Sequence, residues 1–171
     1  MPTVKPRQAA PALDVATVDG GRWRLADAAP EKFTMIYFYR GYHCPVCKVQ
    51  LRQLDRQLDE FAQRGVEVVA VSGDEEERAR KTPEEWGLKR LRVGYGQTVE
   101  SMREWGLFVS RSIKETEPAT FGEPGMFLIR PDGTVYWEAI SSMPFARPRF
   151  EDILLGLDRV AELNYPARGE A

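Results

Sequence analysis

Two cysteines three residues apart, Cys44 and Cys47, are the residues of this 171-residue chain best suited to chemistry. They are its only cysteines, and its only histidine, His43, directly precedes the first of them. A thiolate is a strong nucleophile, and a second thiol nearby can displace the bound product by closing a disulfide. The pair therefore predicts thiol–disulfide chemistry, in which Cys44 attacks a substrate disulfide or peroxide and Cys47 resolves the intermediate.

The segments on either side of the cysteines predict a strand that leads directly into a helix. The run from Phe33 to Tyr39 is apolar and aromatic with little alternation, as in a strand covered on both faces. Residues 45–64 place apolar side chains at helical spacing, and Pro45 is tolerated in the first turn because amides there have no intrahelical partner. Cys44 then lies at the helix N-terminus, where the helix dipole stabilises a thiolate.

Three cationic or ionisable neighbours, Arg40, His43 and Lys48, could add positive potential around the first thiol. Cys47 continues the apolar face of the predicted helix, so we expect it to be the more deeply buried cysteine. This arrangement assigns the catalytic roles to Cys44 and Cys47.

The order of predicted elements indicates an α/β fold with a central mixed sheet flanked by helices. A strand at 66–72 completes a β-α-β unit with the preceding strand and helix, and such units have parallel strands. An N-terminal hairpin precedes the unit, and a hairpin at 126–139 and a helix beginning near Phe150 follow it. The acidic run 74–77 predicts a solvated helix start.

We predict a single domain over 1–171, with residues 1–12 as an extended lead-in and 165–171 as a tail. Residues 107–123 contain no recognisable element, and a loop of that length is usually functional or mobile.

Composition excludes several classes of function. A formal net charge of −2 gives no signal for nucleic-acid binding. No apolar run is long enough to span a membrane, and the N-terminus lacks the apolar core of a secretory signal, so we expect a cytoplasmic protein. Two cysteines in a domain of this size do not form a disulfide scaffold, and in a reducing compartment they favour catalysis, redox sensing or metal binding.

Two other classes of function remain open at the level of sequence. A metal or structural module would use the thiols as ligands, but one chain supplies only the two cysteines and His43. A redox-linked interaction protein would use residues 107–123 to hold a partner.

The stretch 37–48, Tyr-Phe-Tyr-Arg-Gly-Tyr-His-Cys-Pro-Val-Cys-Lys, resembles the thioredoxin-like superfamily, and more narrowly the alkyl hydroperoxide reductase/thiol-specific antioxidant (peroxiredoxin-like) family in its C-P-x-C subgroup. The similarity extends over residues 12–163 and includes 68–72 and 125–133. It implies a thioredoxin-like fold with an N-terminal β-hairpin extension and an insertion before the last β-hairpin.

The family's functional residues carry over only in part. Cys44 matches the attacking cysteine, but Gly41 stands where peroxiredoxins have threonine or serine. Pro124 stands where they have a peroxide-binding arginine, and it resembles the cis-proline that thioredoxins place beside the active disulfide. Arg40 or Arg147 could replace the missing arginine. These departures rank dithiol oxidoreductase chemistry first and peroxide reduction close behind.

The resemblance also implies partners. It points to a thioredoxin- or glutathione-type reductant, to a disulfide or hydroperoxide substrate, and to a homodimer. It implies no organic cofactor.

Overall fold

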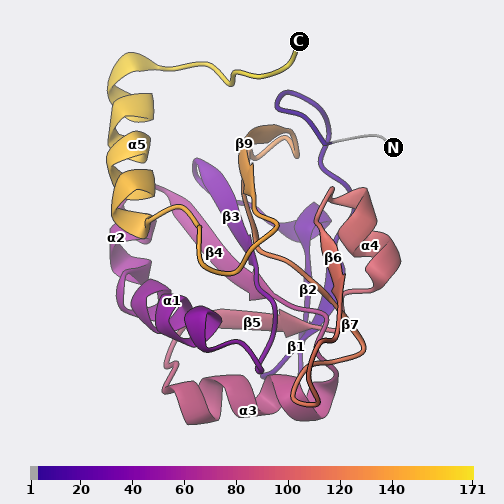
Figure 1. Cartoon of the computed structure of the whole chain (residues 1–171). Helices are drawn as coiled ribbons and strands as arrows, with labels where there is room; N and C mark the ends of the chain where they lie inside the picture. The colour runs from indigo at the N-terminus through magenta and orange to yellow at the C-terminus, as the bar shows by residue number, and fades with distance from the viewer. Residues whose placement is uncertain (1–3) are drawn as a thin grey trace.

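The computed structural model describes residues 4–171 and is organised around one seven-stranded sheet (Figure 1). Its strands are β1 (Asp14–Thr17), β2 (Arg22–Arg24), β3 (Phe33–Phe38), β4 (Val66–Val71), β5 (Arg92–Tyr95), β8 (Gly125–Ile129) and β9 (Val135–Ile140). Their order is β2-β1-β5-β4-β3-β8-β9. β3, β4 and β5 are mutually parallel, and the other pairings are antiparallel. The predicted mixed sheet, N-terminal hairpin and late hairpin are confirmed.

Helices cover both faces of the sheet. They are η1 (Leu25–Asp27, a 3-10 turn), α1 (Pro45–Arg56), α2 (Leu58–Gln63), α3 (Glu76–Trp86), α4 (Val99–Glu104) and α5 (Phe150–Leu163). Buried side chains of α1, α2 and α5 form one core with one face of the sheet, whereas α4 and the N-terminal hairpin form a second core on the other face (Figure 1).

Strand β3 divides its side chains between the two cores. All six of its residues are buried, with Met35 and Tyr37 in the α1 core and Ile36 and Phe38 in the α4 core. Alternation at a period of two sends successive side chains to opposite faces, so a strand with no polar face must be covered twice. This central strand fixes the position at which the chain turns toward Cys44.

The helix predicted for residues 45–64 is interrupted at Gln57. Its backbone N–H is shared between the carbonyls of Gln53 and Leu54, at 3.1 and 3.0 Å, which tightens the last turn of α1 before α2 begins. No glycine or proline marks the break, which is why the sequence did not show it. The apolar face continues across it, because Leu54 and Phe61 both stay fully buried.

Residues 107–123 contain a small hairpin, contrary to the prediction of no element. Strands β6 (Val109–Arg111) and β7 (Thr120–Gly122) pair antiparallel in a separate two-stranded sheet. Its strands are only three residues long and show little hydrophobic alternation. The Ser110 hydroxyl donates to the Glu123 carboxylate at 2.7 Å, a polar cross-link that hydrophobic patterning could not predict.

The lead-in, predicted to be extended, contains a turn, and the tail packs against the sheet. The first three residues of the lead-in lie outside the described range; beyond them, the chain turns at Arg7 (φ 69°) and pairs with the start of β9 through Arg7 N–H to Val135 O at 2.7 Å. The tail packs back on the sheet, where the Tyr136 hydroxyl donates to Tyr165 O and Ala167 is buried. The lead-in and the tail therefore lie at the same end of the molecule, where Arg7 contacts Ala167 O and Glu170 (Figure 1).

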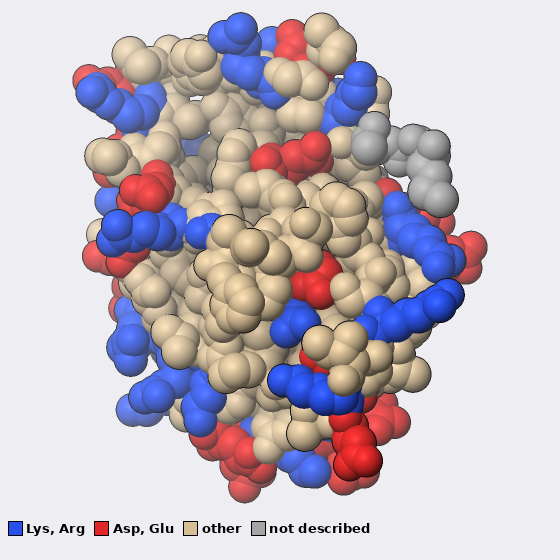
Figure 2. Space-filling model, in the orientation of Figure 1, with Lys and Arg blue, Asp and Glu red and all other residues tan. Residues whose placement is uncertain are grey.

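The surface carries interspersed charges of both signs. On the face in Figure 2, lysine, arginine, aspartate and glutamate side chains surround a central region that is largely, though not wholly, uncharged. Within residues 4–171, no helix combines the length and apolar character needed to cross a bilayer.

Candidate active site

Cys44 lies where the chain leaves β3 and enters α1, as predicted. It is the N-cap of α1, with Pro45 as the first helical residue, and its Sγ accepts the backbone N–H of Cys47 at 3.3 Å. The open first-turn amides and the helix dipole place positive potential on this sulfur. The local sequence therefore supplies backbone groups that help to stabilise a thiolate at Cys44.

Gly41 sets the approach to Cys44 and explains one departure from the family pattern. Its φ of 133° lies in the region that favours glycine, and a Cβ there would be 2.7 Å from Asp74 Oδ1. The same carboxylate accepts the Tyr42 backbone N–H at 2.8 Å. Threonine or serine at position 41 would collide with Asp74, which is buried rather than part of a solvated helix start.

Cys47 lies one turn further along α1, on its buried face. Cys44 and Cys47 are 1% and 0% exposed, so both thiols are buried, and both are free. The prediction that Cys47 is the less accessible cysteine agrees with the pocket beside the pair, which Cys44 lines and Cys47 does not.

Arg147 is the side chain that connects the two sulfurs. It comes from the loop between β9 and α5, and its Nη1 donates to Cys47 Sγ at 3.2 Å while Nη2 donates to Cys44 Sγ at 3.5 Å. The Tyr37 hydroxyl and Gln50 Oε1 also accept from Nη1, at 2.6 and 3.2 Å, and Tyr37 donates to Gln50. This network fixes the guanidinium over the pair.

The two thiols have opposite pKa shifts. Hydrogen bonding from the Cys47 thiol, followed by the Cys47 backbone N–H, Arg40 and Arg147, lowers the pKa of Cys44 against the opposing effect of burial. Burial, and then the neighbouring Cys44, raises the pKa of Cys47. The pair therefore carries one negative charge, and that charge lies on Cys44. Cys44 can then attack as a thiolate while Cys47 remains a protonated resolving thiol.

Arg40 also lies at the site, but its charge is largely compensated. Its Nε contacts Glu123 Oε2 at 2.9 Å, its Nη2 lies 3.8 Å from Glu117 Oε1, and its guanidinium stacks on Phe121 at 4.8 Å. Both carboxylates are buried. None of the ion pairs within residues 4–171 includes Arg147, so Arg147 supplies the uncompensated charge.

His43 does not supply positive potential, contrary to expectation. Burial, followed by the charge of Arg40, lowers its pKa to about 4, so the ring is neutral at pH 7. The ring packs edge-on against Phe121 at 4.7 Å, and within the described chain neither nitrogen has a hydrogen-bond partner.

Pro124 does not reproduce the thioredoxin cis-proline. No peptide bond in residues 4–171 is cis. The chain runs extended from β7 into β8, held on both sides by Glu123 N–H to Phe108 O at 2.8 Å and Ser141 N–H to Pro124 O at 2.9 Å. Pro124 is buried and shares a small surface pocket with Arg147, so it lies beside the loop that carries the guanidinium.

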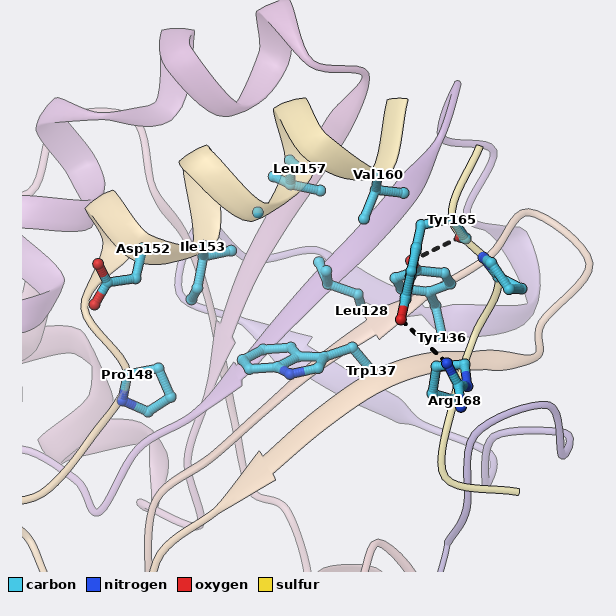
Figure 3. A pocket seen from close by; sticks show the side chains of 12 residues that line it. Leu128, Tyr136, Trp137, Pro148, Asp152, Ile153, Leu157, Val160, Tyr165 and Arg168 are labelled. Atoms are coloured by element: carbon cyan, nitrogen blue, oxygen red, sulfur yellow. Dashed lines mark hydrogen bonds between the residues drawn. The ribbon is translucent and has the colours of Figure 1, made fainter. Parts of the chain in front are cut away.

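A mainly apolar pocket lies apart from the thiols. It measures about 340 Å³ and lies between α5, the strands β8 and β9, and the tail, with Trp137 facing α5 (Figure 3). Neither cysteine lines this pocket. Across residues 4–171, no three His, Cys, Asp or Glu side chains gather as metal ligands.

The fold and these sulfurs define a thiol-dependent oxidoreductase with a thioredoxin-like fold. The AhpC/TSA family profile matches residues 6–138, more than three quarters of the chain, and the chain belongs to that family. No curated protein matches it significantly.

Solved structures show the same fold. A reduced 2-Cys peroxiredoxin of Plasmodium vivax superposes with a TM-score of 0.77 at 21% identity, over 95% of this chain and 84% of that one. A peroxiredoxin-like protein from Aquifex aeolicus superposes with a TM-score of 0.75 at 17% identity, over 94% of this chain and 90% of that one. AhpC of Mycobacterium bovis superposes with a TM-score of 0.75 at 15% identity, over 100% of this chain and 99% of that one.

Proposed function

We propose that this enzyme cycles between the Cys44/Cys47 dithiol and a Cys44–Cys47 disulfide, with Cys44 attacking and Cys47 resolving. The observation that carries the proposal is the position of Cys44 Sγ, which caps α1, accepts the Cys47 amide at 3.3 Å, lies 3.5 Å from an uncompensated guanidinium and lines a surface pocket. Cys47 is buried one turn away and shares that guanidinium.

With a disulfide substrate, the Cys44 thiolate attacks one sulfur, forms a mixed disulfide and releases the other sulfur as a thiolate. Cys47 then gives up its proton and attacks Cys44 Sγ, which releases the second substrate thiol and closes the protein disulfide. Two electrons pass from the dithiol to the substrate. A thioredoxin- or glutathione-type thiol attacks Cys44, which lines the pocket, and releases the Cys47 thiolate. A second thiol of the reductant then displaces Cys44 from the mixed disulfide and restores the dithiol.

Peroxide reduction is the second candidate, and Arg147 favours it. The Cys44 thiolate would attack the nearer peroxide oxygen, become a sulfenic acid and release an alcohol or water; Cys47 would then displace water. The structure puts a guanidinium at Cys44 although Pro124 occupies the family's arginine position, and a charge there can stabilise the departing oxygen.

Trapping of free thiols, read by mass spectrometry, tests the cycle. After exposure to hydroperoxide or to a small disulfide, the wild-type protein should lose two hydrogens and resist alkylation. Cys47→Ser should stop at a sulfenic acid or a mixed disulfide on Cys44, and Cys44→Ser should form neither. A wild-type protein that never closes the Cys44–Cys47 disulfide contradicts the proposal, and comparison of the two oxidants separates the candidates.

We also propose that the protein is cytoplasmic and forms a homodimer. A free cysteine pair without a disulfide scaffold suits a reducing compartment. Fractionation of cells and light scattering of the purified protein test them.

A further inference from the structure

The pocket beside Cys44 has a chemical character that the cysteine pair itself does not explain. It measures about 530 Å³. It is lined by Tyr42, His43, Cys44, Pro45, Lys48, Arg78, Lys81, Glu85, Trp86 and Thr116. A substrate that reaches Cys44 through this pocket meets its lining, so the lining can select among substrates.

Cations outnumber carboxylates in the pocket, although the chain as a whole is acidic. Three of the lining side chains are cationic and only Glu85 is anionic, whereas the formal net charge of the protein is −2. Glu85 accepts the Tyr42 hydroxyl, which occupies one of its oxygens. Lys81 contacts Glu77 at 3.3 Å in an exposed pair, which leaves most of its charge available.

Lys48 is the most available of the three cations. None of the ion pairs within residues 4–171 includes it. It lies in the first turn of α1, one turn beyond Cys44, where the helix dipole adds to its field. Arg78 is tied to the pocket edge by its bond to Thr116 O at 3.0 Å.

An aromatic wall completes the pocket. The rings of Tyr42 and Trp86 are stacked, with centroids 6.2 Å apart and planes within 12°. His43 adds a neutral ring. Two further acids near the pocket are already engaged: Asp74 is buried and holds the Tyr42 amide, and Glu117 is buried and lies 3.8 Å from Arg40 Nη2. The pocket therefore offers an apolar wall for a short alkyl chain and cations for an anionic end.

We propose that this pocket binds small substrates that carry a carboxylate, namely disulfides of low-molecular-weight thiol acids. This inference rests on the proposed thiol–disulfide cycle and adds its substrate class. The carboxylate pairs with Lys48 and Lys81 while Cys44 attacks the nearer sulfur. The carboxylated thiol leaves as a thiolate, and Cys47 releases the second one by closing the protein disulfide. The cations also offset the repulsion between an anionic substrate and the Cys44 thiolate.

Alkylation with a charged and a neutral reagent tests the pocket without requiring turnover. Iodoacetate and iodoacetamide transfer similar groups to a thiolate and release the same ion, but only iodoacetate is anionic. Their rate ratio at Cys44, located by peptide mapping, cancels any change in thiolate content. In the K48Q/K81Q variant the ratio should fall about 3- to 10-fold, and added salt should lower it in the wild type.

Lys32→Gln is the matched control. It removes one exposed lysine at the far end of β3, about 20 Å from the end that leads to Cys44. Its iodoacetate/iodoacetamide ratio should equal that of the wild type. An unchanged ratio in K48Q/K81Q, or an equal fall in Lys32→Gln, overturns the proposal.

Two disulfides, one anionic and one neutral, then test the substrate class. The rate for bis(2-carboxyethyl) disulfide, relative to bis(2-hydroxyethyl) disulfide, should fall in K48Q/K81Q and stay constant in Lys32→Gln. Equal losses for both disulfides overturn the proposal. If no oxidant closes the Cys44–Cys47 disulfide, the proposed cycle fails instead, and the alkylation ratio still decides whether the pocket selects anions.

Discussion

Replacement of Arg147 by glutamine should raise the pKa of the Cys44 thiol by about 1–2. The guanidinium Nη2 lies 3.5 Å from Cys44 Sγ. Full charges at that distance would interact by about 5 kcal/mol at an effective dielectric constant of about 20, which is an upper bound for a side chain partly open to water. A hydrogen bond to a charged group contributes about 1.5–3 kcal/mol, and 1.4 kcal/mol corresponds to 1 in pKa.

The pH dependence of iodoacetamide alkylation at Cys44 measures this pKa directly. Arg149→Gln is the matched control, because Arg149 is an exposed arginine two residues further along and its removal changes the net charge equally. Far-ultraviolet circular dichroism establishes that both variants are folded. Equal Cys44 pKa values in the two variants would show that Arg147 does not stabilise the thiolate.

Three further perturbations test the structure around the thiols. Arg40→Met should lower the free energy of unfolding in urea by about 3–5 kcal/mol, because it leaves the buried Glu123 carboxylate without its cation. Arg22→Met, which breaks an exposed ion pair with Asp14, should cost much less, and equal losses would contradict the role given to burial. Gly41→Ala should lower the free energy of unfolding more than Gly133→Ala does. Both glycines have positive φ, but only at position 41 would a Cβ meet another group, Asp74 Oδ1 at 2.7 Å. Equal losses of stability in the two variants would contradict the steric explanation. The pKa of His43 is about 4 in the folded protein, against an ordinary value of 6.5, so between these values the unfolded state binds more protons and the free energy of unfolding should rise with pH. In urea titrations at several pH values, His43→Phe should flatten that rise. An unaltered slope would show that another group causes it.

The parts of the site that the sequence predicted are local in the chain. The apolar run 33–39, the cysteine spacing and the stripe of α1 together placed Cys44 at a strand-to-helix junction, and the structure agrees. Backbone periodicity carries this information, because burial on one face of a helix or two faces of a strand leaves a repeating pattern.

The parts that the sequence missed depend on tertiary contacts. Arg147 is 100 residues from Cys47, in a loop with no hydrophobic period, and sequence could name it as a candidate but not place it. The compensation of Arg40 by Glu117 and Glu123 depends on the β6–β7 hairpin, which has no strong pattern of its own. The neutral state of His43 follows from burial beside Arg40, which the motif alone does not reveal.

The different surroundings of the two arginines have a consequence for the redox poise of the pair. Arg40 keeps its carboxylate partners whether the cysteines are reduced or oxidised. Arg147 has the shared thiolate as its anion, and closure of the disulfide removes that charge and leaves the guanidinium with only neutral acceptors. Stabilisation of the thiolate therefore favours the reduced form and makes the disulfide more oxidising. Each 1.4 kcal/mol is worth about 30 mV for a two-electron couple, so Arg147→Gln should lower the reduction potential by about 30–60 mV. Equilibration with glutathione buffers measures this difference, and a potential equal to that of Arg149→Gln would show that the guanidinium interacts equally with both redox states.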